Sequence, residues 1–198
     1  MELLLESRAQ KLRPTAITTS SRLRRLLWGL VLHSFYRFSP NFLHPWRRML
    51  LRLFGANVGS GAHPYPKAKV WAPWNLTMEQ HSCLANDVDC YCVAKVTICR
   101  SAIVSQYSYL CTASHDYDAA NFPLVSAPIV IRSSAWVGAD CFIGPGVEIG
   151  EGAVIGARST VVRDVPPQSV VVGNPARVVR VRMHGESNSK ESESDRTK

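Results

Sequence analysis

The sequence predicts an all-β fold, a parallel β-helix built from hexapeptide repeats. One observation is an aliphatic residue at every sixth position: Ile131, Val137, Ile143, Ile149, Ile155 and Val161. Another is the small residue that directly follows most of these aliphatics: Gly138, Gly144, Gly150 and Gly156. A period of six fits neither an α-helix, with a period of about 3.6, nor a simple strand, with a period of about 2. It is typical of a triangular coil in which each hexad forms one flat face.

Less regular hexads extend this pattern toward the N-terminus. Their leading residues form three sets, separated by two extra residues each: Val58, Pro64 and Val70; Met78, Leu84 and Cys90; Ile98, Val104 and Leu110. The 21 residues from Leu110 to Ile131 are not a multiple of six. We therefore expect a β-helix over residues 57–166 from which a loop, residues 116–128, departs. A long loop leaving a regular repeat is typically functional.

The residues before the repeats carry all of the excess positive charge. Residues 1–56 contain ten Arg and Lys against two Glu, whereas the remaining chain has thirteen of each sign. We expect residues 1–20 to be poorly ordered. Leu23, Leu26, Leu27 and Leu30 then follow helical spacing, and a second helical segment ends near Gly55. Residues 21–56 are thus predicted to form a basic amphipathic helical arm.

Two compatible interpretations of this arm remain open. In the first interpretation, the arm caps the open end of the β-helix. In the second, the apolar face of the same arm also rests on an anionic membrane surface. The longest apolar run, Leu26 to Leu32, has seven residues, far short of the roughly 20 that span a bilayer. At the other end, we expect a C-terminal extension over 167–184 and a disordered tail over 185–198.

The cysteine pattern and the position of the basic residues bear on location and partners. All six cysteines lie in the repeat region without a CxxC pair, so we interpret them as free thiols in a reducing compartment. No secretory signal is evident. We expect a cytoplasmic protein, peripheral at the inner face of the membrane. Nucleic-acid binding is disfavoured, because the basic residues lie on an apolar helix.

His115 is the candidate catalytic residue. It ends its hexad at the point where the predicted loop departs. The next residues, Asp116, Tyr117 and Asp118, are polar groups suited to orienting an imidazole or a substrate. Because an imidazole titrates near neutrality, it can take a proton from a hydroxyl at working pH.

Four stretches carry a resemblance to a known family: Trp74–Thr77, Leu110–Asp116, Ala135–Gly138 and Val172–Arg177. From about Leu26 to Arg182 the chain resembles the left-handed β-helix O-acetyltransferases, of the colanic-acid and galactoside/maltose types. The resemblance implies a left-handed coil and a homotrimer. It also implies acetyl-CoA as co-substrate, no metal, and a saccharide hydroxyl as acceptor, in an exopolysaccharide or lipid-linked glycan precursor.

Matched residue by residue, the resemblance also implies site residues. His115 is the general base. The coenzyme A positions are Ala139, Ala157, Val162, Arg163, Arg177 and Arg180. Three further candidates for substrate contacts come from position rather than from a residue-by-residue match: Asn86, Asp116 and Trp136. For Trp136 two interpretations stay open, lining the pantetheine or acceptor cleft and shielding a seam between subunits. Where galactoside enzymes place an Asn and an Asp for the sugar, this chain has Ala85 and Val93, so we expect an acceptor other than a simple galactoside.

Three alternatives stay open at this point. The first is a non-catalytic scaffold that kept the fold. The second is a serine-type acetyltransferase, which usually has a larger N-terminal helical domain than 56 residues. The third is a metal-dependent hydratase, which needs three histidines around one zinc; His63, His81 and His115 are its candidates.

Overall fold

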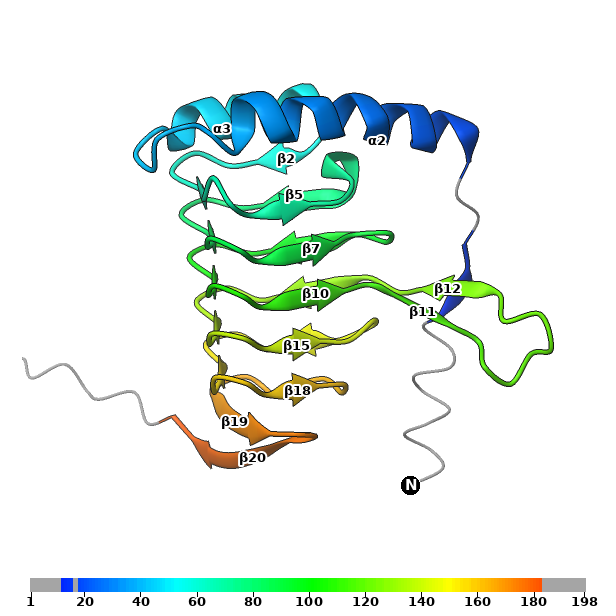
Figure 1. Ribbon diagram of the computed structural model, residues 1–198. Helices are drawn as coiled ribbons and strands as arrows, with labels where there is room; N and C mark the ends of the chain where they lie inside the picture. The colour runs from blue at the N-terminus through cyan, green and yellow to red at the C-terminus, as the bar shows by residue number, and fades with distance from the viewer. Residues whose placement is uncertain (1–11, 16–17, 183–198) are drawn as a thin grey trace, which may run out of the picture.

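The structure, a computed structural model, describes residues 12–15 and 18–182 of the 198-residue chain. Its body is a stack of three-sided coils, with helices across one end and a β-hairpin at the other (Figure 1). The helical segments are α2 (Thr19–Val31), the π-helix η1 (Leu32–Tyr36), α3 (His44–Leu53) and the 3₁₀-helix η2 (Pro73–Asn75). The expectations for residues 1–11, 16–17 and 183–198 lie outside the described residues.

Each side of the coil is a sheet of short strands, named here face I, face II and face III. Face I consists of β2 (Asn57–Val58), β5 (Leu76–Met78), β8 (Val96–Ile98), β13 (Ile129–Ile131) and β16 (Glu148–Ile149). Face II consists of β3 (His63–Pro64), β6 (Cys83–Leu84), β9 (Ile103–Val104), β14 (Trp136–Val137), β17 (Val154–Ile155), β19 (Ser169–Gly173) and β20 (Ala176–Val181). Face III consists of β4 (Lys69–Val70), β7 (Asp89–Tyr91), β10 (Tyr109–Cys111), β15 (Phe142–Ile143) and β18 (Thr160–Val161).

The residues predicted to lead each hexad form the core along the coil axis. Each sits beside its equivalent in the next coil through parallel pairing: on face I, Val58 pairs with Met78 and Met78 with Ile98. All the predicted leading residues from Val58 to Val161 are buried. Their side chains replace water with neighbouring aliphatic groups, which is the dominant favourable contribution to folding. The predicted all-β parallel β-helix is therefore confirmed.

Close stacking at the corners explains the small residues that follow the axial ones. A Cβ atom on Gly138 would lie 2.6 Å from the carbonyl oxygen of Ile155 in the next coil. Two residues further on, Asp140 adopts a left-handed conformation with φ of 58°, which turns the chain onto the next face. Asn and Asp tolerate this conformation better than most residues.

The predicted loop is a β-hairpin arm, which we define as residues 113–126. Strands β11 (Ala113–His115) and β12 (Leu124–Ser126) pair antiparallel, with His115 opposite Leu124. The Ala127 N–H donates to the Thr112 carbonyl at 2.9 Å and closes the base of the arm. The expected loop boundaries, 116–128, are thereby corrected, because backbone pairing extends strand structure into both ends of the insertion.

A short N-terminal strand adds to this arm. In β1 (Arg13–Pro14), Arg13 pairs with Ser126, and the Thr15 and Ser126 hydroxyls lie 2.6 Å apart. The Thr18 hydroxyl then accepts from the Ser21 N–H and caps α2. The described part of residues 1–20 thus contains one short strand and a helix cap, while the expected poor order of that segment stays a prediction. The backbone of residues 13–15 forms hydrogen bonds with the edge of β12. The sequence pattern does not reveal this edge, because the two segments lie far apart in the chain.

The helical arm covers the first coil, as predicted. The buried Trp28 donates from Nε1 to the Val70 carbonyl at 2.6 Å. Arg47, also fully buried, donates from Nε to the Pro64 carbonyl at 2.7 Å and from its other nitrogens to the segment between the helices, including the carbonyls of Pro40 and Asn41. Burial lowers the pKa of Arg47 from its ordinary value. These hydrogen bonds compensate for the lost hydration of a buried cation.

The axial stacking predicts an asymmetry between two isoleucines in neighbouring strands. Ile98 is fully buried, whereas Ile103 is 43% exposed. We expect Ile98→Ala to reduce the free energy of unfolding by about 2–5 kcal/mol, because it leaves a cavity between coils. The matched control Ile103→Ala is expected to cost about 1 kcal/mol or less. Urea denaturation followed by circular dichroism measures both, and equal losses would contradict the assignment of inward and outward sides.

Candidate active site

His115 lies at the end of β11, where the arm projects from the coil, and its side chain is exposed. Its Nδ1 lies 2.7 Å from the Phe122 carbonyl oxygen across the arm. A carbonyl oxygen can only accept, so Nδ1 carries the hydrogen and Nε2 of the neutral ring presents its lone pair. The ring is therefore held in the tautomer that a general base needs, with Nε2 as the accepting atom.

The polar residues that follow His115 do not orient its imidazole. The Asp116 carboxylate accepts from the Asp118 N–H at 3.2 Å and so stabilises the turn of the arm. The Tyr117 side chain is largely exposed. The Phe122 carbonyl contacts the imidazole instead, and a role of these residues in orienting a substrate stays a prediction. A backbone carbonyl has no sequence signature, and Phe122 reaches its place through a left-handed backbone, with φ of 43°.

Three of the predicted site residues lie along the corner between faces II and III. They are Asn86, which follows β6 in the second coil, and Ala139 and Ala157, which follow β14 and β17 in the fourth and fifth coils. The Ala139 carbonyl accepts from the Arg158 N–H at 2.9 Å, which stacks two of these coils directly. The Asn86 amide oxygen accepts from the Lys67 N–H at 3.1 Å, so Asn86 also supports the first coil. The two alanines leave this corner without large side chains.

The other predicted coenzyme positions lie near the C-terminal hairpin. Val162 and Arg163 follow β18, and Arg177 and Arg180 lie on β20. Val162, Arg163 and Arg177 line a common pocket of about 140 Å³. The Arg177 guanidinium donates to its neighbour, the Ala176 carbonyl, and Arg180 is exposed. The structure thus brings together three of the six predicted coenzyme positions, and two of them are cationic.

A single chain does not bring all of these residues together. His115 projects from the corner between faces III and I, whereas Ala139 and Ala157 lie at the corner between faces II and III. The full width of face III separates the two corners, about six extended residues or roughly 15–20 Å. Trp136 lies on β14 of face II, half exposed, with Nε1 donating to the Ser105 hydroxyl at 2.9 Å.

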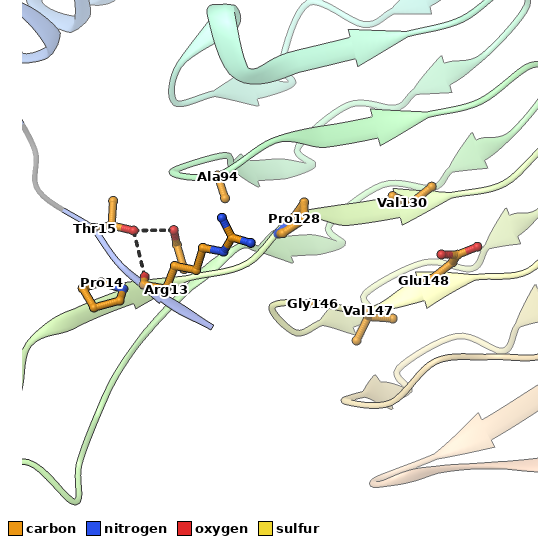
Figure 2. Close-up of a pocket in the computed structure, with 10 residues that line it drawn as sticks. Arg13, Pro14, Thr15, Ala94, Pro128, Val130, Gly146, Val147 and Glu148 are labelled. Atoms are coloured by element: carbon orange, nitrogen blue, oxygen red, sulfur yellow. Dashed lines mark hydrogen bonds between the residues drawn. The ribbon is translucent and has the colours of Figure 1, made fainter. Parts of the chain in front are cut away.

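A second cleft lies beside the arm and was not predicted. It measures about 700 Å³ and runs between the N-terminal strand, the base of the arm and the edge of the lower coils (Figure 2). Arg13 and Thr15 line one side, and Gly146 and Glu148 the other. The cleft exists because β1 docks on β12, which joins residues more than 100 positions apart. No predicted site residue lines it.

Two further properties concern metals and membranes. Among residues 12–15 and 18–182, no three His, Cys, Asp or Glu side chains form a group that could hold a metal ion. His63 packs against His44, with ring centroids 4.9 Å apart, while His115 stands on the arm. Within the same part of the chain, no helix combines the length and apolar character that crossing a bilayer requires.

Comparisons with known proteins agree with this architecture. The family model for the bacterial transferase hexapeptide, six repeats, matches residues 128–163. A protein of Escherichia coli strain K12, named as a colanic acid biosynthesis acetyltransferase, WcaF, is 39% identical over 173 residues, which cover 87% of this chain and 95% of that protein.

Solved structures agree over a similar length. A hexapeptide-repeat-containing acetyltransferase from Vibrio cholerae, in complex with acetyl coenzyme A, is 25% identical with a TM-score of 0.77, covering 91% of this chain and 98% of that one. A galactoside acetyltransferase in complex with coenzyme A is 27% identical with a TM-score of 0.68, covering 90% of both chains. Because both sequence and coil agree over nearly the whole chain, this protein belongs to the family of hexapeptide-repeat acetyltransferases.

Proposed function

We propose that this protein is an acetyl-CoA-dependent O-acetyltransferase that transfers an acetyl group to a saccharide hydroxyl, with His115 as the general base. The observation that carries the proposal is the 2.7 Å contact between Nδ1 of His115 and the Phe122 carbonyl, which leaves Nε2 as the accepting atom of the neutral ring. The solved relatives in complex with acetyl coenzyme A and coenzyme A support the choice of acyl donor.

In this mechanism, Nε2 of His115 removes the proton from the acceptor hydroxyl as its oxygen attacks the thioester carbonyl. A carbon–oxygen bond forms, and the resulting oxyanion needs a preorganised donor. The Gly138 N–H already donates to the Ile155 carbonyl at 2.9 Å, so we assign this role to the next amide, that of Ala139, in an adjacent subunit. Collapse of the intermediate breaks the carbon–sulfur bond, and the imidazolium returns its proton to the thiolate of coenzyme A.

The coenzyme positions fit the chemistry of the donor. Ala139 and Ala157 give the corner between faces II and III a smooth edge along which a pantetheine chain can lie. Arg163 and Arg177, which line one pocket, offer charge and multiple N–H donors to phosphate groups. Val162 and Arg180, at the same end of the coil, complete the proposed coenzyme-binding residues.

We infer that the active form is a homotrimer with sites between subunits. The separation of His115 from the Ala139–Ala157 corner supports this, because a site limited to one chain lacks either the base or the coenzyme edge. A closed ring with head-to-tail interfaces places the arm of one chain against the corner of the next. Asn86 and Trp136, on the same side as that corner, then contact the acceptor from the neighbouring subunit, and Asp116 approaches it from the arm.

A saccharide is the acceptor class that we favour. The Escherichia coli relative named for colanic acid biosynthesis supports it. Ala85 and Val93 stand where galactoside enzymes have polar sugar ligands, so we propose a lipid-linked or polymer precursor rather than a simple galactoside. The six cysteines of the chain are free, which accords with the cytoplasm, where acetyl-CoA is made.

The role of His115 predicts a large and specific loss. We expect His115→Asn to lower kcat for acetyl transfer by about 10²–10⁴-fold, because it removes the proton acceptor. The matched control is His81→Asn, in a corner whose φ of 59° an asparagine adopts readily. Radiolabelled acetyl-CoA with nucleotide sugars, lipid-linked glycans and L-serine as acceptors measures both variants. Full activity in His115→Asn would exclude this mechanism, and transfer to serine alone would exclude a saccharide acceptor.

The arginine pocket predicts an effect on donor binding. Arg163→Gln and Arg177→Gln are each expected to raise KM for acetyl-CoA about tenfold or more, since a hydrogen bond to a charged group contributes about 1.5–3 kcal/mol. We expect kcat to change little, because neither side chain touches the reacting atoms. Arg100→Gln, an exposed arginine at another corner, is the control. An unchanged KM in both pocket variants would place the phosphates elsewhere.

A site shared between subunits predicts complementation. We expect His115→Asn and Ala139→Trp each to be inactive, the first through loss of the base and the second through obstruction of the coenzyme edge. Unfolding and refolding an equal mixture is expected to restore about a quarter of the wild-type activity, because each mixed trimer contains one intact interface. No recovery despite mixed trimers by mass measurement would show that both groups act within one chain.

A further inference from the structure

We propose that the outer surface of the N-terminal helices docks onto an anionic lipid bilayer. We define the cap face as the exposed large apolar side chains of α2, η1, α3 and their linker. They are Leu23, Leu26, Leu27, Leu30, Phe35, Phe38, Phe42, Leu43, Trp46, Met49 and Leu53. The cap face does not include His115, and the docking does not depend on the acyl-transfer proposal.

The helices are apolar on two sides. One side is buried against the coil, and the other, the cap face, is exposed. On α2, Trp28 packs toward the coil, whereas Leu23, Leu26, Leu27 and Leu30 recur every three or four residues on the opposite side. On α3, Leu50 and Leu51 are buried while Met49 and Leu53 are exposed. The repeat that caps a solenoid ordinarily has a polar outer face. Here the outer face is apolar, which marks an interaction surface.

The linker between the helices extends this surface. Phe38 and Phe42 are 79% and 76% exposed, although aromatic rings gain strongly from burial. Trp46, beside them, donates from Nε1 to the Phe35 carbonyl at 3.1 Å, so its ring lies at the surface with its polar atom satisfied. Aromatic side chains with this combination are typical of the boundary between lipid chains and headgroups.

Charge identifies the partner as anionic. From residue 18 to residue 78 the sequence contains nine Arg and Lys and no Asp or Glu. Arg22, Arg37 and Arg52 are exposed on the helices and linker that carry the cap face. A second copy of the cap would present the same positive charges and be repelled. A bilayer with acidic headgroups offers the complementary charge together with an apolar interior.

A basic pocket at the rim of the cap fits a headgroup. It measures about 330 Å³ and lies between α2 and the first coil. The cations lining it are Arg25, Arg37, Lys67 and Lys69, with His33 beside them and Asp89 as the only lining acid. The Arg25 guanidinium lies over the Trp71 ring, 4.2 Å from its centroid. Its buried Nε has no hydrogen-bond partner among the residues that the structure describes. An anionic phosphate group would supply that partner.

Docking in this way orients the whole coil. The helices lie across the end opposite the C-terminal hairpin, and the arm projects sideways between the two ends (Figure 1). His115 follows the third coil, so it stands roughly 10 Å beyond the first coil, in water but near the membrane surface. A bilayer at the cap face therefore leaves the arm and the corners of the coil accessible.

Vesicle binding tests the proposal with the full chain. We expect the protein to sediment with vesicles of phosphatidylcholine and phosphatidylglycerol and to bind at least tenfold more weakly to phosphatidylcholine alone, with added salt weakening the binding. Phe38→Ser with Phe42→Ser is expected to lower the partition coefficient at least tenfold. Arg37→Gln with Lys67→Gln is expected to lower it about tenfold to thirtyfold, since each basic residue near the surface contributes about 1 kcal/mol.

The control replaces two exposed valines at the far end, Val179→Ser with Val181→Ser, and is expected to bind vesicles like the wild type. Far-UV circular dichroism establishes that each variant is folded. The proposal is overturned if the wild type ignores anionic vesicles, or if folded cap variants bind them unchanged. It is equally overturned if light scattering shows cap-to-cap pairs of assemblies that the phenylalanine variant abolishes while vesicle binding is absent.

Discussion

Parallel stacking of one axial aliphatic residue on the next holds every other feature of this molecule in place. Each strand of the coil is only two or three residues long in most positions, so no single strand pair is stable alone. Stability comes from neighbours that repeat the same geometry, as in other solenoids. Met78 on Ile98 and Ile98 on Ile131 illustrate this, because the second pair stays in register although the arm lies between its members.

Because the register resumes after the arm, the insertion does not interrupt the coil. The chain leaves at Thr112 and returns at Ala127, and a backbone hydrogen bond between these residues closes the gap. The arm therefore forms its own antiparallel pairing without interrupting the axial stack. Antiparallel pairing within the arm brings the Phe122 carbonyl to Nδ1 of His115. In the proposed mechanism, the coil supplies rigidity and the arm supplies the general base, a division common in enzymes.

Different structures cover the two ends of the solenoid. At the C-terminal end, β19 and β20 continue face II as an antiparallel hairpin. At the N-terminal end, α2 and α3 cover the first coil, and Arg47 anchors them through hydrogen bonds to main-chain carbonyls. A buried arginine stabilises a fold only when its donors are satisfied, which fixes the helices in one position. This fixed position leaves the apolar cap face turned outward.

The sequence by itself determined the coil. Its period of six, the axial positions from Val58 to Val161 and the site of the interruption follow from local spacing, because each hexad repeats one steric requirement. It also singled out His115, through its place at the interruption. Only the tertiary structure decided what surrounds that histidine. The Phe122 carbonyl, the docking of β1 on β12 and the separation of His115 from Ala139 depend on backbone groups and on contacts between distant residues, which carry no periodic signal.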